Sequence, residues 1–335
     1  MKKTFIPKEF RPSVPGSSLK SLNRSVFEFP RNSENRPEKY VILSSQGDLV
    51  AKKVWESLKS NKTAIHFYLD ELGYTWDFSY SNERLTLLTP SGKITPLSIY
   101  HRHPGVAQDH PFYSKHISLF EVMDIWKGNS IGQKRDHFHN TSKPYQIIHS
   151  VLQAVKKINT DKVGIAKTYL VKGNIREIKS RLDKQYIVKS CSSMRSIAAT
   201  EQDYNSWEMQ DLKNVPVMFQ EYIDGTDYRI HFMDDYTWTL SVISKDRADY
   251  RYSSKHSLEY RLETIPSELD DFCKDLSKIE DNRFIGVDLI KTGDRYVCLE
   301  SNPGPDWSTF YHPSRDQFNH FFIQTLAQEE KGYHV

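Results

Sequence analysis

Short apolar runs and helical patterns alternate along this chain from about residue 39 onward. Residues 40–43 and 65–69 are rich in β-branched and other apolar side chains, which indicates two buried strands. Between them, residues 50–58 carry an apolar side chain at every fourth position behind Asp48, a residue typical of helix N-termini. This β-α-β order predicts the start of an α/β domain.

The same pattern extends the predicted elements to about residue 190, whereas the first residues lack it. Residues 1–38 are rich in Pro, Ser, Asn and Lys without periodicity, so we expect an N-terminal extension outside the folded domains. Further strands are predicted over residues 76–78, 85–88, 94–100 and 185–189, helices over 117–126, 142–158 and 174–182, and a turn over 90–92.

The composition describes a soluble globular protein with room for two or three packed subdomains. The chain has 335 residues, of which 38% are hydrophobic and 27% are charged. Its longest apolar runs are strand-sized and its first residues are polar, so we expect no membrane partner and no signal peptide. The three cysteines are far apart, as reduced thiols of a cytoplasmic protein would be. A net charge of only +3 argues against a nucleic-acid partner.

The most informative segment is a predicted hairpin of two apolar strands around a three-residue loop at residues 292–294. In this register Asp288 lies opposite Cys298, and side-chain alternation places Asp288 and Glu300 on one face, a diagonal step of roughly 7 Å apart. Asn302 adds a neutral oxygen just beyond them. Two carboxylates and an amide oxygen suit Mg²⁺ when water and nucleotide phosphate supply its other ligands.

A lone pair of acids would indicate an ordinary hairpin with solvated side chains, but here the pattern is longer. The sequence G-x-D-L-I, a turn and L-E-x-N-P-x-x-x-W resembles the metal-binding end of ATP-grasp ligases. Its N-P-x-x-x-W ending is similar to the RimK-like graspetide, or microviridin-type, synthetases, which close ester and amide macrocycles in ribosomally made peptides. The resemblance implies that Asp288, Glu300 and Asn302 bind Mg²⁺.

The resemblance also implies a fold class, namely the ATP-grasp fold with α/β and α+β domains. After the extension, we expect an N-terminal α/β domain over residues 39–139 and a central ATP-grasp subdomain over 140–215. A C-terminal ATP-grasp subdomain would follow over 216–335. In this fold the nucleotide lies between the two α+β subdomains.

Segments that resemble the nucleotide-binding parts of the family follow in the expected order. Lys143, after Asn140, and Lys189, at the end of a strand, would be the two nucleotide lysines, which act as point charges beside phosphate oxygens. A capped helix with a solvated lysine is the alternative for Lys143. Serines after Lys189 replace the glycines of the family's phosphate loop. The strand and hinge along the adenine and ribose would contribute Gln220, Glu221, Tyr222, Ile223 and Asp227, and which acid binds the ribose stays open.

Three basic residues would carry the catalytic charge in this family. Arg229 matches an arginine aimed at the reacting phosphoryl group, where a planar bidentate donor suits a developing acyl phosphate. Lys245 and Arg251 match residues that contact the acyl phosphate or the acid substrate. A charge-rich strand edge is the alternative for the segment that contains these last two residues.

The implied activity is that of an ADP-forming ligase that uses ATP and Mg²⁺. It would activate Asp or Glu side chains of a precursor peptide as acyl phosphates and join them to Ser, Thr or Lys. The alternatives are a RimK-like ligase that adds an amino acid to a peptide or small acid, and a nucleotide-binding scaffold without turnover. We expect a peptide partner with a leader and an acidic core. The sequence does not decide between a monomer and a homodimer.

A further expectation concerns the leader of the precursor peptide. Tyr250, Tyr252 and Tyr260 lie among the basic residues Arg251, Lys255 and Arg261. Such an aromatic and basic surface suits an acidic or amphipathic segment. A solvated hairpin beside the active site is the alternative.

Overall fold

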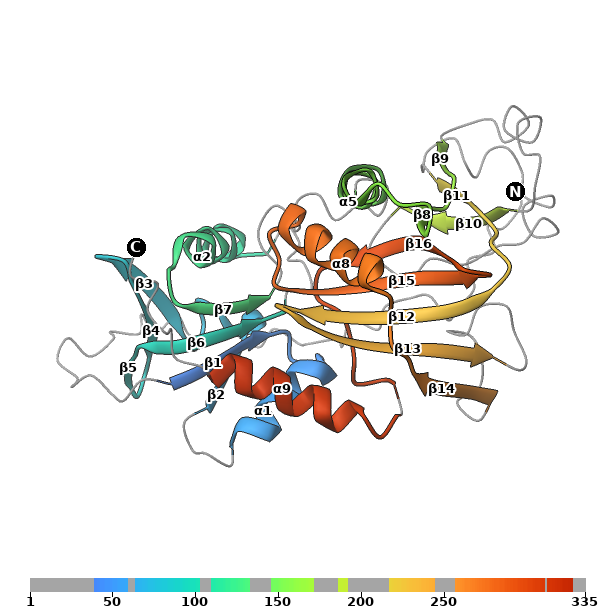
Figure 1. The fold of residues 1–335 in the computed structure, drawn as a ribbon. Coiled ribbons are helices and arrows are strands. Elements are labelled where there is room, and N and C mark those ends of the chain that lie inside the picture. The colour runs from blue at the N-terminus through green and yellow to red at the C-terminus, as the bar shows by residue number, and fades with distance from the viewer. Residues whose placement is uncertain are drawn as a thin grey trace, which may run out of the picture.

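The computed structural model describes residues 39–59, 64–102, 110–132, 146–171, 186–191, 217–244, 257–310 and 312–327. Within these ranges the chain forms several sheets flanked by helices (Figure 1). The first elements are β1 (Lys39–Ser44), α1 (Leu49–Leu58), β2 (Ala64–Tyr68), the 3₁₀ helix η3 (Leu69–Glu71), β3 (Asp77–Ser81), β4 (Arg84–Thr89), β5 (Gly92–Ile94), β6 (Pro96–His101), α2 (Tyr113–Ile125) and β7 (Asn129–Gly132).

The remaining elements supply a small and a large sheet with their helices. They are the π-helix η4 (Gln146–Val151), α5 (Leu152–Ile158), β8 (Val163–Ile165), β9 (Thr168–Val171), β10 (Tyr186–Ser190), β11 (Val217–Glu221), β12 (Thr226–Met233), β13 (Tyr236–Ser244), β14 (Leu258–Leu262), α8 (Ser267–Ile279), β15 (Phe284–Thr292), β16 (Arg295–Asn302) and α9 (Arg315–Ala327). Among the described helices, none is long and apolar enough to span a membrane.

The N-terminal part is built on a parallel sheet with strand order β2-β1-β6-β7. Helix α1 packs on one face, and α2 and the three-stranded sheet β3-β4-β5 pack on the other. Helix α1 begins at the predicted cap, because Asp48 Oδ1 accepts hydrogen bonds of 2.9 Å from the backbone N–H groups of Val50 and Ala51. The predicted β-α-β start of an α/β domain is confirmed.

The single strand predicted over residues 94–100 is wrong, because the chain changes sheets within it. Strand β5 pairs with β4 across the predicted turn, whereas β6 pairs with β1. Pro96 begins β6. A proline has no N–H to donate and is therefore favoured at the first position of a strand.

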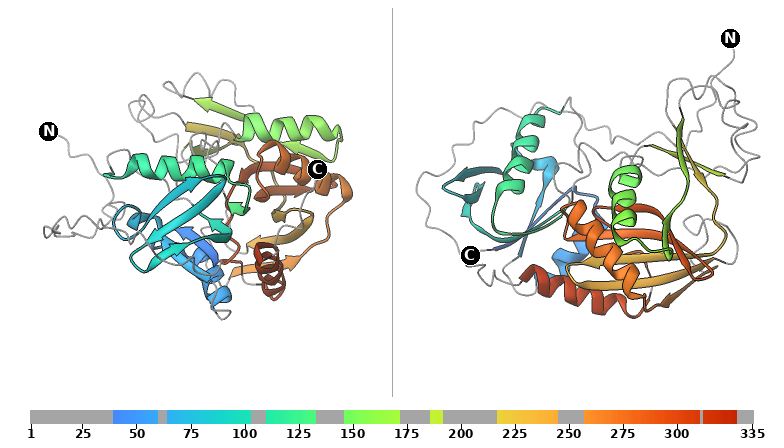
Figure 2. Two further views of the ribbon diagram at one scale, coloured as in Figure 1. Left: turned by 90° about the vertical axis from the view of Figure 1, so that its left-hand side faces the viewer. Right: turned by 45° about the horizontal axis from the view of Figure 1, so that its top comes forward.

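The C-terminal part is built on a six-stranded sheet with the order β14-β13-β12-β15-β16-β8. Its neighbouring strands are antiparallel except for β16 and β8, which are parallel. Helices η4, α5 and α8 cover one face. Helix α9 packs on the other face, against side chains of β13 and β15 (Figure 2). Part of this second face carries the candidate site.

Helices α8 and α9 are absent from the sequence prediction. In α8 the buried positions Leu269, Phe272, Cys273 and Leu276 follow the i, i+3, i+4, i+7 spacing of a helix on a sheet. This pattern is visible in the sequence and could have been used. In α9, apolar residues lie on several sides, and the helix packs between the two halves of the molecule.

A small antiparallel sheet with the order β10-β11-β9 lies beside the large one (Figure 1). Sheet membership does not follow the predicted subdomain boundary at residue 216, since β11 pairs with β10 and β9. Conversely, β8 and α5 lie in the predicted central subdomain but pair with or pack on the large sheet. The boundaries themselves stay a prediction.

Candidate active site

The hairpin of β15 and β16 brings Asp288 and Glu300 directly opposite each other. The predicted pairing of Asp288 with Cys298 is wrong, because Thr292 pairs with Arg295 across a two-residue turn and an extra residue, Leu299, shifts the register farther along. A β-bulge of this kind places two residues against one and moves the next side chain along the strand. The two carboxylates therefore share one face at the shortest cross-strand step rather than a diagonal one.

A row of charged side chains crosses three strands on this face. Arg229 on β12 pairs with Asp288, and Asp288 pairs with Glu300. Arg229 Nη1 donates to Asp288 Oδ1 at 2.7 Å, and Asn302 Nδ2 donates to Asp288 Oδ2 at 3.0 Å. Arg229 and Glu300 are 7% and 4% exposed. These contacts fix the orientation of Asp288 before any ligand arrives.

The donor set of this row fits Mg²⁺. Two carboxylates and an amide are hard oxygen ligands, and Mg²⁺ in proteins is usually held by one or two carboxylates together with phosphate oxygens and water. Among the residues that the structure describes, no group of three or more His, Cys, Asp or Glu side chains is arranged to hold a metal. With two carboxylates and one amide oxygen, the row suits an ion whose other ligands are water and nucleotide phosphate oxygens.

Gly286 explains the glycine of the G-x-D pattern. It pairs with Asn302, and a Cβ at this position would lie 2.6 Å from Pro305 Cβ and 2.7 Å from Arg229 Nη2. Any side chain would push away either the segment after β16 or the arginine. The glycine therefore lets the chain after β16 pass close to the sheet.

His231 lies two residues after Arg229 on β12, so its side chain is on the same face of the sheet. It stacks on Trp238, with ring centroids 5.1 Å apart, and its Nε2 lies 3.2 Å from the carbonyl oxygen of Asp306. Burial and then the charge of Arg229 hold the pKa of His231 well below its usual value. The imidazole is therefore neutral and contributes no positive charge to the site.

Lys189 and Gln220 meet on the small sheet. Lys189 Nζ donates to Gln220 Oε1 at 2.8 Å, and Gln220 Nε2 donates to the carbonyl oxygen of Leu299 at 3.0 Å. Both side chains are buried, with 4% of Lys189 and 1% of Gln220 exposed. The side chain of Gln220, predicted as a nucleotide contact, is therefore engaged with the protein here.

The other predicted hinge residues follow directly. The backbone N–H of Glu221 donates to the carbonyl of Lys167 at 2.8 Å, and Tyr222 and Ile223 continue from the end of β11 as half-buried residues. Asp227 on β12 points to the same face as Arg229, since the two residues are two positions apart on one strand. This places the hinge next to the charged row, and the ribose assignment stays a prediction.

Three predicted site residues lie outside the described residues, namely Lys143, Lys245 and Arg251. The serine-rich loop after Cys191 and most of the predicted leader surface lie outside them too. Tyr260 and Arg261 of that surface are described, and both lie on β14. Tyr260 packs partly buried against the core, with its ring centroid 5.8 Å from that of Phe310, and Arg261 Nε pairs with Glu259 Oε1 at 2.8 Å.

Arg102 is a residue whose role the sequence did not indicate. Its Nε pairs with Asp48 Oδ2 at 2.7 Å, and its Nη1 donates to the carbonyl oxygens of Gly304 and Pro305 at 2.9 and 3.1 Å. Burial opposes its charge, but Tyr100 and Asp48 outweigh this effect and raise the pKa of the guanidinium. Arg102 therefore stays charged and ties β6 to the segment that follows Asn302.

Glu280, at the end of α8, supports the same strand from the opposite face of the sheet. Ser301 lies between Glu300 and Asn302, and its Oγ donates to Glu280 Oε2 at 2.9 Å. Burial raises the pKa of Glu280 to about 7, although hydrogen bonds with Ser301 and Ser150 act in the other direction. Nothing in the local sequence marks this acid, which lies in a polar stretch.

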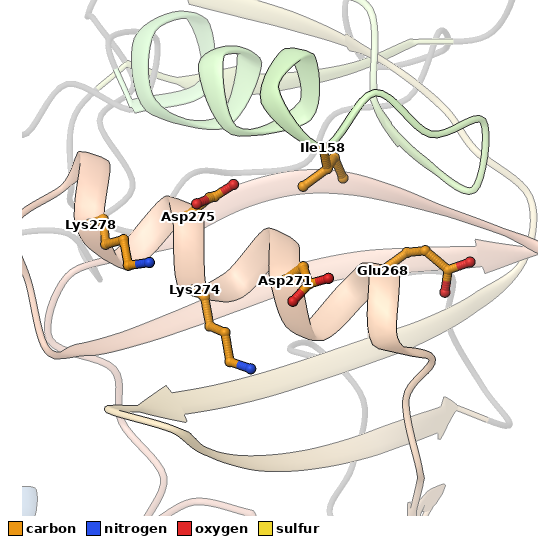
Figure 3. Close-up of a pocket in the computed structure, with 6 residues that line it drawn as sticks. All are labelled: Ile158, Glu268, Asp271, Lys274, Asp275 and Lys278. Carbon is orange, nitrogen blue, oxygen red and sulfur yellow. The ribbon is translucent and has the colours of Figure 1, made fainter.

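A surface hollow of about 280 Å³ lies against the outer side of α8, away from this site (Figure 3). Charged side chains of both signs line it together with Ile158 at the end of α5. Lys274 pairs there with Asp270 and Lys157 with Asp275. It contains none of the predicted site residues, and the six-stranded sheet separates it from the charged row.

Comparison with known proteins identifies the fold. No family model and no curated protein matches the chain. The macrocyclase MdnC of Microcystis aeruginosa MRC, bound with precursor peptide MdnA, is similar over 86% of this chain and 99% of its own, with a TM-score of 0.65 and 16% identity. The ATP-grasp ligase PsnB, complexed with a variant of its minimal precursor, Mg and ADP, is similar over 86% and 99%, with a TM-score of 0.66 and 19% identity.

A ligase from Chryseobacterium gregarium gives the same result. This RiPP-associated ATP-grasp ligase, in complex with ADP and a leader and core peptide, is similar over 87% of this chain and 97% of its own, with a TM-score of 0.65 and 16% identity. Each of these likenesses covers 86–87% of this chain. The chain therefore has the ATP-grasp fold, in a form similar to that of peptide macrocyclases.

Proposed function

We propose that this protein is an ATP-dependent, ADP-forming ligase that closes ester or amide macrocycles in a ribosomally made precursor peptide. The observation that carries the proposal is the row of Arg229, Asp288 and Glu300, with Asn302, in a fold shared with precursor-bound macrocyclases. Lys189, 4% exposed, adds a positive charge on the side of the small sheet. Acids and bases arranged in this way suit a polyphosphate and a cation held together.

The residues of the row would act before and during phosphoryl transfer. Asp288, Glu300 and Asn302 would hold Mg²⁺, which when bound supplies positive charge to the phosphate oxygens. Arg229 orients Asp288 through their 2.7 Å contact. Lys189 would place its ammonium group beside the phosphates. The role of Arg229 at the reacting phosphoryl group, and those of Lys245 and Arg251, rest on the family resemblance.

The proposed reaction has two steps. An Asp or Glu carboxylate oxygen of the peptide bonds to the γ-phosphorus of ATP, and the bond from that phosphorus to the oxygen of ADP breaks. A Ser or Thr hydroxyl or a Lys amine of the same peptide then attacks the acyl carbon, loses its proton and displaces phosphate. Each ring removes one water from the peptide and converts one ATP to ADP and phosphate.

Mass spectrometry of a cognate precursor peptide incubated with enzyme, ATP and Mg²⁺ tests the proposal. We expect loss of one water per ring, together with ADP and phosphate. Formation of AMP and pyrophosphate would contradict acyl phosphate chemistry. A mass gain from an added amino acid would support the RimK-like alternative, and nucleotide binding without turnover would support a scaffold.

The partner in this proposal is a precursor peptide with a leader and an acidic core. A tethered leader raises the effective concentration of successive core residues, which suits an enzyme that closes several rings in one peptide. We place the enzyme in the cytoplasm, without a nucleic-acid or membrane partner. A leaderless core processed as fast as the full precursor at low concentration would contradict a docking role for the leader.

A further inference from the structure

Gln220 makes a three-way contact between the two sheets that border the candidate site. Its Oε1 accepts a hydrogen bond from Lys189 Nζ at 2.8 Å. Its Nε2 donates to the carbonyl oxygen of Leu299 at 3.0 Å and to Thr168 Oγ1 at 3.3 Å. A carboxamide has two N–H donors and one carbonyl, so these contacts use both ends of the group. The side chain is 1% exposed and is part of the protein interior.

The contact with Leu299 joins the small sheet to the metal-binding strand. Leu299 is the bulged residue of β16 and immediately precedes Glu300. A bulge leaves its extra residue outside the regular ladder, so that its carbonyl can accept from a side chain of a neighbouring element. Gln220 therefore connects Lys189 on β10 with the backbone of β16 directly before Glu300.

We propose that Gln220 is a positioning residue that sets the distance between the Lys189 ammonium group and the Glu300 carboxylate. This inference rests on the proposed function, in which phosphate oxygens contact Lys189 while Mg²⁺ is held at Glu300. The two groups lie on different sheets, and one polyphosphate must reach both Lys189 and the Mg²⁺ held at Glu300. A single side chain hydrogen-bonded to each sheet fixes their separation before the nucleotide binds.

The Gln220 side chain is uncharged, which preserves the positive field of Lys189. A glutamate at this position would form an ion pair with Lys189 and reduce the positive field that the phosphates experience. It would also place a carboxylate oxygen against the carbonyl of Leu299, with no N–H to donate. A carboxamide orients the lysine, keeps its full charge and bonds the bulge at the same time.

Binding of ADP tests this inference without any peptide chemistry. Calorimetry would measure ADP affinity first without metal, in excess chelator, and then at a series of Mg²⁺ concentrations. The proteins compared are the wild type, Gln220→Met and Lys189→Met. Gln220→Met keeps the length of the side chain and removes all three hydrogen bonds. We expect it to weaken ADP binding about tenfold and to raise the Mg²⁺ concentration needed for half-maximal binding several-fold. Lys189→Met should weaken ADP binding without changing the Mg²⁺ requirement.

Two further variants complete the design. Thr168→Val removes the 3.3 Å contact with Gln220 and the 2.9 Å hydrogen bond from Thr168 Oγ1 to the carbonyl oxygen of Ala166, and it leaves the contacts of Gln220 with Lys189 and Leu299 in place. It is the matched control, for which we expect ADP affinity and Mg²⁺ requirement within about twofold of the wild type. Gln220→Glu keeps an acceptor for Lys189 but cannot donate to Leu299, and we expect it to raise the Mg²⁺ requirement too. If circular dichroism shows that Gln220→Met does not fold, Gln220→Glu still tests the inference.

An unchanged Mg²⁺ requirement in both Gln220 variants would overturn the inference, because Gln220 would then act through Lys189 alone. Equal effects of Thr168→Val and Gln220→Met would also overturn it, since that result indicates general loss of packing. If the wild type binds ADP with Mg²⁺ as expected but closes no ring in a peptide, the proposed function fails and the positioning role stands. Absence of ADP binding by the wild type would overturn both.

Discussion

Asp288 and Glu300 are the residues on which the proposed chemistry depends most. Replacing either carboxylate by an amide, Asp288→Asn or Glu300→Gln, removes an anionic ligand and should reduce turnover by about a hundredfold or more, with a higher Mg²⁺ requirement. Steady-state kinetics over a range of Mg²⁺ concentrations measures both effects, and circular dichroism should change little. Near wild-type turnover at sub-millimolar Mg²⁺ in either variant would make the hairpin purely structural.

Stability should distinguish these two variants. Asp288 is the ion-pair partner of Arg229, whose side chain is 8% exposed. Asp288→Asn leaves that buried charge with a weaker partner and should lower the free energy of unfolding by about 2 kcal/mol. Glu300→Gln leaves the ion pair of Arg229 and Asp288 in place and should cost less. Urea unfolding of both proteins checks this order.

Glu280 predicts a pH dependence of stability. Its folded-state pKa is raised from 4.5 to about 7, so folding favours the protonated form. The stability that this group contributes is fully present below pH 4.5 and is lost as pH rises through about 7. The shift corresponds to about 3 kcal/mol in total. Glu280→Gln should remove this dependence.

Chemical denaturation of the wild type and Glu280→Gln from pH 5 to pH 8 measures the effect as a difference between the two proteins. We expect the wild type to lose stability relative to the variant as pH rises. A constant difference over this range would show that Glu280 titrates as an ordinary surface acid.

Residue-level prediction from sequence succeeded where strand periodicity alone decides. Alternation placed Asp288 and Glu300 on one face, and the pairing of the strands agrees. The bulge at Leu299 could not be foreseen, because a three-residue loop and a two-residue loop with a later bulge differ by local backbone geometry. Glu280 was equally hidden, since its burial depends on where α8 packs.

At the scale of elements, Asp48 at the start of α1 has two structural roles. Asp48 caps the helix through Oδ1 and pairs with Arg102 through Oδ2. Asp48→Ala removes both contacts and should lower the free energy of unfolding by about 2 kcal/mol. Asp48→Asn is the matched control, because asparagine caps helices as well as aspartate but leaves Arg102 without a carboxylate.

Urea unfolding of the two variants separates the roles. We expect Asp48→Asn to cost about half as much as Asp48→Ala. Equal losses would indicate that the cap contributes little and that the ion pair with Arg102 accounts for the whole effect. In that case both substitutions would act mainly on the segment after β16, because Arg102 donates hydrogen bonds to Gly304 and Pro305 in that segment.

Local elements were predictable from sequence, whereas their partners were not. Spacing of apolar residues indicated β1, α1, β2, β4 and β10 because each pattern lies within a few residues. The sheet order was out of reach, since β8 pairs with β16 more than a hundred residues later. The family resemblance, through the motif around Asp288, supplied the overall fold that periodicity could not.

At the scale of the whole molecule, the predicted N-terminal and C-terminal domains share one hydrophobic core. Val54 of α1 and Tyr100 of β6 belong to the same cluster as Trp238 of β13, Phe284 of β15 and Phe322 of α9. The ring of Phe322 lies 4.9 Å from that of Tyr100 and 5.4 Å from that of Phe284. Helix α9 thus joins the two parts, and the charged row lies next to this junction.

This shared core predicts that the two parts lose stability together. Phe322→Ala removes a fully buried ring and should lower the free energy of unfolding by about 3–5 kcal/mol. Hydrogen exchange followed by mass spectrometry should show faster exchange in peptides from both β6 and β15. The neighbouring Phe321 stacks on Tyr236 of β13, with centroids 4.2 Å apart, so Phe321→Ala should affect β13 and leave β6 unchanged. Faster exchange in only one part after Phe322→Ala would show that the two domains fold independently and that α9 merely lies between them.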